Sequence, residues 1–321
     1  MIKYRKISIT FLFILFLSGC RGTWRQPFPE AEIIYQTGRS TDQVGFVNSN
    51  GSGSTILMVG GDFRKPVWSV DGSLIYGLAL YMQVTTTGYP SYWSEDGVFK
   101  VCKDWGHVNW ITGAGNPGNM KEVLISDAFK ISMVNLGDCS YIKTLVDYTI
   151  DYSKKPDNKM RVTVSFSLSP DRSELLYGLH ISECYPSGDK TYCEDEDKIM
   201  KLDLMTGLET DMVRGINPSW SPDGSTIAYI QADGIYLMNA DGTGQRQLIN
   251  RELGDSRPGH SIGSDLNAAP HWSPDGQWIV YHRCDTSVTC LVNKNTIYKV
   301  NVETGQEVKI VEGGAYPSWK P

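Results

Sequence analysis

A short motif recurs along this chain at intervals of about 50 residues and constrains the fold more than any other feature. The two clearest copies, NPSWSPDG and APHWSPDG, span Asn217–Gly224 and Ala269–Gly276. Partial copies lie at Lys65–Gly72, Ser167–Arg172 and Tyr316–Trp319. A repeat of this length cannot bury its own apolar face, so neighbouring repeats must pack against one another. The sequence therefore indicates a repeat architecture.

Each motif is followed by runs in which apolar and polar residues alternate. In the best-defined repeat these runs are Thr226–Ile230, Ile235–Asn239 and Gln247–Ile249, and the turn Ala240–Gly244 separates the last two. Alternation with a period of two, between turns rich in Pro, Asp and Gly, is typical of antiparallel strands. With the strand that carries the motif, each repeat is predicted to form a four-stranded blade of an all-β protein.

The two ends of the chain are predicted to complete one blade. Tyr316–Trp319 is a first strand with nothing after it, whereas Glu32–Tyr35, Val44–Asn48 and Thr55–Met58 are a second, third and fourth strand without a first. Pairing of the ends would remove exposed sheet edges. We predict a six-bladed β-propeller closed by the C-terminal strand; a seven-bladed ring would need a further blade that the sequence does not show. First strands are expected near Trp68, Trp110, Leu168, Trp220, Trp272 and Trp319.

The blade that Trp110 opens is the least regular, with further strands expected at Glu122–Ile125, Ile131–Asn135 and Tyr141–Val146. The tryptophan of each repeat is expected to wedge between neighbouring blades. The aspartate of each Ser-Pro-Asp turn is expected to hold that turn by an Asx-type hydrogen bond and to have no catalytic role. These aspartates are Asp71, Asp171, Asp223 and Asp275.

The motifs around Trp68, Trp220 and Trp272 resemble the WD40-like (PD40) repeat of the TolB C-terminal propeller, which also occurs in prolyl-oligopeptidase relatives. The resemblance covers nearly all of residues 32–321. It implies an envelope interaction role, because the propeller of that family contacts other envelope proteins. No room remains before residue 32 for the α/β domain that precedes the propeller in TolB, so we expect a relative by repeat type and not TolB itself.

The N-terminal residues read as an export signal. Three basic residues precede the apolar run Ile7–Leu17, which is shorter than the roughly 20 residues of a membrane-spanning helix. The following Leu17-Ser18-Gly19-Cys20 resembles the lipobox of bacterial lipoproteins, which implies cleavage before Cys20 and lipidation of that cysteine. We expect a signal peptide at 1–19, a tether at 20–31 and a single propeller domain at 32–321. An uncleaved membrane anchor is the alternative.

The net charge and the expected location of the protein limit the kinds of partner that it can bind. The chain has 36 acidic and 30 basic residues, a net charge of −6, so it lacks the basic surface that a nucleic acid requires. We expect a monomeric lipoprotein, exported and anchored to a membrane in the periplasm or on the surface of a bacterium. The expected partner is an envelope protein or a glycan.

Six cysteines follow Cys20, an even number that suggests disulfides in an oxidising compartment. The blade alignment pairs Cys184 with Cys193 and Cys284 with Cys290, because each pair brackets one hairpin. Cys102 and Cys139 are paired only by elimination.

Two motifs of catalytic type lack the structural context that they require. Gly259–Gly263 matches the serine nucleophile pattern G-x-S-x-G, and Gly113–Gly118 matches the dinucleotide pattern G-x-G-x-x-G. Both motifs work at the start of a helix, and neither is followed by one here. We therefore expect no catalytic residue, no cofactor and no metal site.

His271 is the only histidine among the residues that directly precede the repeated tryptophans. First strands line the channel of a propeller, so His271 is expected there. If it met His107, His260 or a carboxylate at the channel mouth, the protein could instead be an envelope enzyme resembling a polysaccharide lyase or hydrolase. A detached regulatory propeller of a peptidase is a third alternative.

The predicted turns divide a propeller into two faces. The short-turn face carries the repeated Ser-Pro-Asp-Gly turns, whereas the long-loop face carries dissimilar loops, including residues 181–197. Four consecutive acids, Glu194, Asp195, Glu196 and Asp197, follow Cys193 in that loop. Variable loops on a rigid scaffold are where recognition usually occurs. We expect the partner to bind on the long-loop face beside these acids, with His271 as a further candidate contact.

Overall fold

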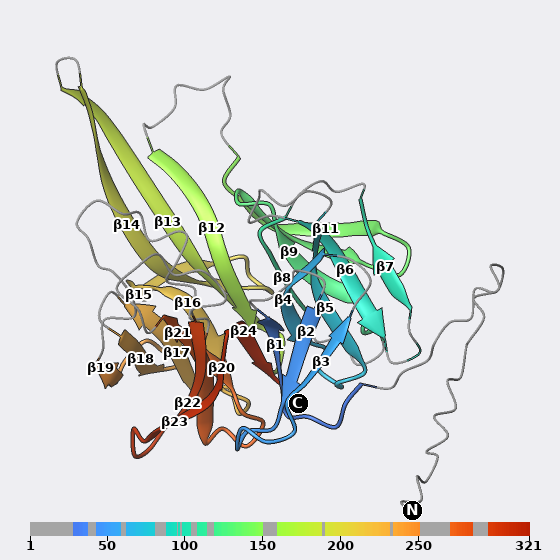
Figure 1. Cartoon of the computed structure of the whole chain (residues 1–321). Coiled ribbons are helices and arrows are strands. Elements are labelled where there is room, and N and C mark those ends of the chain that lie inside the picture. The colour runs from blue at the N-terminus through green and yellow to red at the C-terminus, as the bar shows by residue number, and fades with distance from the viewer. Residues whose placement is uncertain are drawn as a thin grey trace, which may run out of the picture.

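The computed structural model describes residues 28–37, 43–58, 62–80, 88–94, 96, 98–103, 108–113, 119–149, 159–187, 190–231, 234–250, 270–284 and 295–321. Six four-stranded antiparallel sheets form a ring, which confirms the predicted all-β six-bladed propeller (Figure 1). No helix long and apolar enough to cross a membrane occurs in this part of the chain.

Every blade has its four strands in chain order except the last. The first three blades are blade 1 with β4 (Asp62–Trp68), β5 (Leu74–Leu80), β6 (Tyr89–Ser94) and β7 (Phe99–Val101); blade 2 with β8 (Trp110–Gly113), β9 (Glu122–Ser126), β10 (Lys130–Asn135) and β11 (Ser140–Asp147); and blade 3 with β12 (Lys159–Leu168), β13 (Glu174–Ser187), β14 (Lys190–Asp203) and β15 (Glu209–Arg214).

The remaining blades include the one that closes the ring. They are blade 4 with β16 (Ile216–Trp220), β17 (Thr226–Gln231), β18 (Gly234–Asn239) and β19 (Arg246–Asn250); blade 5 with β20 (His271–Trp272), β21 (Trp278–Cys284), β22 (Asn295–Asn301) and β23 (Glu307–Glu312); and blade 6 with β24 (Gly314–Trp319), β1 (Ile33–Thr37), β2 (Gln43–Val47) and β3 (Thr55–Met58).

Blade 6 joins the two ends of the described chain as predicted. Ile33 lies opposite Trp319 and Ile34 opposite Ser318 in the β1–β24 ladder. The ladder continues past the strand, because Lys320 N donates to the carbonyl oxygen of Glu32 at 2.6 Å. The ring is therefore closed by hydrogen bonds between segments far apart in the sequence, and β24 supplies the innermost strand of blade 6.

The repeated tryptophans wedge between blades, as predicted for four of them. Each packs in a buried cluster that also contains residues of the preceding blade: blade 6 for Trp68, blade 3 for Trp220, blade 4 for Trp272 and blade 5 for Trp319. Trp110 does not hold this position. In blade 1, Trp68 lies opposite Ile75. The corresponding residue of blade 2 is Gly113, opposite Val123, so blade 2 has no tryptophan at this position. Trp110 lies three residues earlier in the same strand.

The predicted hydrogen bond is present in all four turns, of which three are Ser-Pro-Asp and the one at 69–71 is Ser-Val-Asp. In the copy at 221–225, Ser221 Oγ donates to Asp223 Oδ1 at 2.6 Å, and Ser225 N donates to the same oxygen at 3.0 Å. Ser221 Oγ also accepts from Thr226 N at 2.9 Å. These bonds lower the pKa of Asp223, and they lower the pKa of Asp171 to about 2. The aspartates are structural, since their carboxylates are used within the turn.

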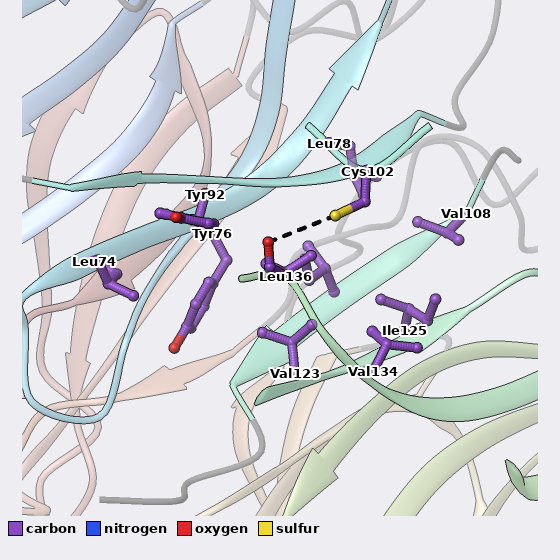
Figure 2. Close-up of a cluster of buried hydrophobic side chains, with 11 residues drawn as sticks. Leu74, Tyr76, Leu78, Tyr92, Cys102, Val108, Val123, Ile125, Val134 and Leu136 are labelled. Carbon is purple, nitrogen blue, oxygen red and sulfur yellow. Dashed lines mark hydrogen bonds between the residues drawn. The ribbon is translucent and has the colours of Figure 1, made fainter. Parts of the chain in front are cut away.

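The junction between blades 1 and 2 is an apolar core (Figure 2), and a disulfide also links the two blades. Tyr76 and Leu78 of blade 1 pack with Val123 and Ile125 of blade 2. Cys102, which follows β7 and is 1% exposed, lies in this core and forms a disulfide with Cys139 of the β10–β11 turn. Because the disulfide joins two blades, it limits their separation on unfolding.

The predicted loop at residues 181–197 is wrong. β13 and β14 pair without interruption from Glu174 opposite Asp203 to Ser187 opposite Lys190, so these residues form strands. Figure 1 shows this hairpin projecting well beyond the rest of the ring. A disulfide and a histidine–aspartate pair link the two strands of this polar stretch, as the next subsection describes.

Candidate functional site

The extended part of the β13–β14 hairpin, here called the arm, comprises residues 180–187 and 190–197. It lies on the predicted long-loop face and is the outermost feature of the propeller (Figure 1). Among the described residues, a third strand pairs only with its base, where Met160 lies opposite Ser182 and Lys159 lies opposite Glu183. The outer half is therefore a two-stranded ribbon, which has little stability unless side chains join its strands.

A disulfide supplies one such link. Cys184 lies opposite Cys193, and the two form a bond with a Cα–Cα distance of 4.1 Å. The pairing is the one expected from the sequence, although both cysteines lie within the strands and not at their ends. This link stiffens the ribbon just below its tip.

The four consecutive acids do not form a single patch. Successive side chains of a strand point to opposite faces, so Asp195 and Asp197 lie on one face of the ribbon and Glu194 and Glu196 on the other. Glu196 forms ion pairs with Lys198 at 3.5 Å and with Arg214 at 3.4 Å. Part of the acidic charge is therefore neutralised within blade 3.

His180 binds the acids of the first face. Its Nδ1 lies 2.9 Å from Asp197 Oδ1, and its Nε2 lies 3.8 Å from Asp195 Oδ1. The hydrogen bond to Asp197 raises the pKa of His180, an effect that its partial burial opposes. The sequence alone does not indicate a role for this histidine, because its pairing with Asp197 depends on the register of the two strands.

The second face ends in two tyrosines at the tip. Tyr185 lies opposite Tyr192, next to the disulfide, and their exposed fractions are 41% and 62%. Large exposed aromatic side chains of this kind are enriched in protein interfaces. Glu194 is two residues away on the same face and is exposed. The tip thus combines apolar area with a negative charge.

His271 lies in the channel between blades 5 and 6, away from the arm. Its Nδ1 accepts from Trp319 N at 3.4 Å, and its Nε2 lies 3.4 Å from Ser318 Oγ. Serines make the same link elsewhere: Trp68 N donates to Ser318 Oγ, and Trp220 N donates to the hydroxyl of the serine 53 residues before it. Burial lowers the pKa of His271 to about 4, so the ring is neutral at pH 7. It therefore takes the structural place of a serine.

The opposite end of the first strands carries a second group of channel residues. Lys65, Asn217 and Tyr316 each precede a proline and have positive φ of 50°, 52° and 51°. Lys65 Nζ donates to the carbonyl oxygen of Asn109 at 3.0 Å and lies over the Trp110 and Tyr316 rings. Burial, aided by nearby Arg64, lowers the pKa of Lys65 to about 8.

The possible metal ligands among the described residues are dispersed. No group of three His, Cys, Asp or Glu side chains in this part of the chain is placed to hold a metal ion. The proposed companions of His271, His107 and His260, lie outside the described residues, as do Cys20, the Gly259–Gly263 motif and the Cys284–Cys290 pairing.

The fold and the arm define a class: a six-bladed β-propeller with an extended, disulfide-linked hairpin. This propeller is TolB-like. TolB from Acinetobacter baumannii superposes with a TM-score of 0.61 at 14% identity, over 90% of this chain and 66% of that one. A putative TolB from Agrobacterium tumefaciens gives a TM-score of 0.56 at 16% identity, over 90% and 98% of the two chains.

Sequence comparisons agree over shorter stretches. Residues 203–317 match the family described as the dipeptidyl peptidase IV (DPP IV) N-terminal region. The Tol-Pal system protein TolB of Alcanivorax borkumensis is 39% identical over 67 residues, 19% of this chain. That match spans only 13% of the length of the relative. The similarity thus concerns the propeller repeats.

Proposed function

We propose that this protein is a lipid-anchored propeller of a bacterial envelope that binds a protein partner through the tip of its arm. The observation that carries the proposal is the pair Tyr185 and Tyr192, which lie opposite each other and are exposed near the end of the arm. A TolB-like propeller fold supports a protein as the partner. In this proposal the propeller is not an enzyme.

The arm is suited to binding because it is ordered before the partner arrives. Flexible loops lose conformational freedom when they bind, and that loss reduces affinity. The Cys184–Cys193 disulfide and the cross-strand pairs remove much of this freedom in advance. The tyrosines can then contribute apolar contact area and hydroxyl hydrogen bonds at low entropic cost.

The charge of the arm indicates the kind of partner surface. Glu194 accompanies the tyrosines, whereas Glu196, Asp195 and Asp197 are at least partly engaged by cations of the same blade. A partner with a basic patch around an apolar pocket would match this arrangement, and association should weaken as salt rises. His271 is partly buried between blades 5 and 6 and is not part of this surface.

Membrane anchoring through Cys20 places the arm next to its partner. Replacing Cys20 with alanine should release the protein from the membrane fraction or leave an uncut precursor, because stable anchoring requires more than one acyl chain. Unchanged mass and unchanged membrane association in the Cys20→Ala variant would refute the anchor. We expect the anchored protein to be a monomer.

The binding proposal is tested by capture of partners from native envelopes with the wild-type protein and two matched variants. Tyr192→Ala removes an exposed tyrosine from the arm, and Tyr141→Ala removes one that is 59% exposed on the outer strand of blade 2. Loss of a specific protein with Tyr192→Ala alone supports the proposal. Equal capture by all three proteins, or capture of glycan alone, contradicts it.

A further inference from the structure

The channel opens on the short-turn face into a cavity. Its volume is about 450 Å³, within the range of small-molecule sites. The wall is mostly apolar and is formed by the last residues of the first strands and by the prolines of the turns. It includes Trp68, Leu168, Trp220, Trp272, Trp319 and Pro222.

Two cations also line this cavity. Arg172 projects from the turn of blade 3, and Lys320 follows the closing strand β24. Lys320 Nζ lies 5.0 Å from the centre of the Trp68 ring. Within the described part of the chain, no carboxylate forms an ion pair with either side chain, and the carboxylate of the neighbouring Asp171 is held by Ser169 and Ser173. The cavity thus has positive charge beside apolar walls.

The backbone of Arg172 gives an independent reason to regard its side chain as functional. The corresponding residue of the other three turns is Gly72, Gly224 or Gly276, with φ of 69°, 72° and 69°. Arg172 adopts the same left-handed conformation at φ 63°, where a side chain is unfavourable and glycine is not. A strained residue that persists beside a cavity is a common sign of function.

We infer that this cavity binds a carboxylate attached to an apolar or aromatic body. The planar guanidinium of Arg172 can take a carboxylate through two parallel hydrogen bonds, and Lys320 can add a second positive charge. The indole-lined wall then covers the apolar body of the ligand. The ligand chemistry is shared by free aromatic acids and by the C-terminus of a polypeptide that ends in an apolar residue.

The site is separate from the proposed arm interaction, because it opens at the end of blade 3 opposite the arm. The experiment measures binding of 3-phenylpropionate, and of a peptide ending in phenylalanine with a free or an amidated C-terminus, by calorimetry on the full-length exported protein. Binding of the small acid identifies a free acid as sufficient. Binding of the free-ended peptide alone identifies a polypeptide terminus.

Two variants connect binding to the residues. Arg172→Gly restores the glycine of the other repeats, so it should fold at least as well as wild type while reducing affinity by about tenfold or more. Lys320→Gln should reduce affinity less, and Lys143→Ala, which removes an exposed lysine from β11, should have no effect. Failure of all three probes to bind at millimolar concentration, or wild-type affinity in Arg172→Gly, would overturn the inference.

Discussion

His180 and Asp197 lie directly opposite each other in the β13–β14 ladder, and His180 Nδ1 is 2.9 Å from Asp197 Oδ1. This pair lies where the hairpin leaves the body of blade 3. Four consecutive acids repel one another, but one of them, Asp197, is bonded to His180 on the opposite strand. This bond links the two strands. The arm can therefore continue as an ordered ribbon to the tyrosines at its tip.

The stability of the arm should depend on pH through this pair. Asp197 raises the pKa of His180, so the stabilisation is fully present below pH 6.5, the ordinary pKa of histidine, and is lost as pH rises through the folded pKa. Amide hydrogen exchange of residues 180–197 should speed up beyond its intrinsic increase as pH rises above about 6.5. His180→Gln should remove this dependence; an unchanged profile in the variant would reject the link.

The buried histidines of the channel should have the opposite pH dependence. Burial lowers the pKa of His271 to about 4 and that of His282 to about 3, below the value of 6.5 in an unfolded chain. The unfolded state therefore binds more protons below pH 6.5, and the free energy of unfolding falls as pH drops from about 6.5 towards 4. His271→Ser, which copies the residue of two other repeats, should flatten the curve of melting temperature against pH. A steeper curve would show that His271 is charged in the fold.

The two described disulfides should differ in their effect on global stability. Replacing Cys102 and Cys139 with alanine removes a link between two blades and should lower the free energy of unfolding by about 3 kcal/mol. The same change at Cys184 and Cys193 should cost less, because that loop is short and lies outside the ring. Denaturant unfolding of the two double variants measures the difference, and a larger loss for the arm variant would contradict this assignment.

Closure of the ring predicts an unusual cost of truncation. Deletion of 316–321 removes most of β24, its pairing with β1 and the Trp319 wedge. We expect insoluble or protease-sensitive protein, because the inner edge of blade 6 becomes exposed. A truncated protein that melts within a few degrees of wild type would show that closure contributes little.

The sequence was sufficient for the blades but not for the sites. The spacing of Trp68, Trp220 and Trp272 and the complementary chain ends revealed the ring, because each repeat carries its own wedge and turn. The arm was missed because polar residues in a two-stranded ribbon resemble a loop until their cross-strand partners are known. The sequence does show that Arg172 replaces the glycine of a repeated turn. Its position beside a cavity could be found only from the structure.

Cross-linking in intact cells, with a photoreactive amino acid at position 192, is the most direct test of whether the arm binds a protein partner. At position 192 the probe replaces the most exposed aromatic residue of the arm, and the same probe at position 141 is the control on blade 2. We expect one discrete protein adduct from position 192 and no such adduct from position 141. The adduct from position 192 should be reduced when Glu194 is replaced by lysine. Adducts of equal strength from both positions, or none from position 192, would contradict it.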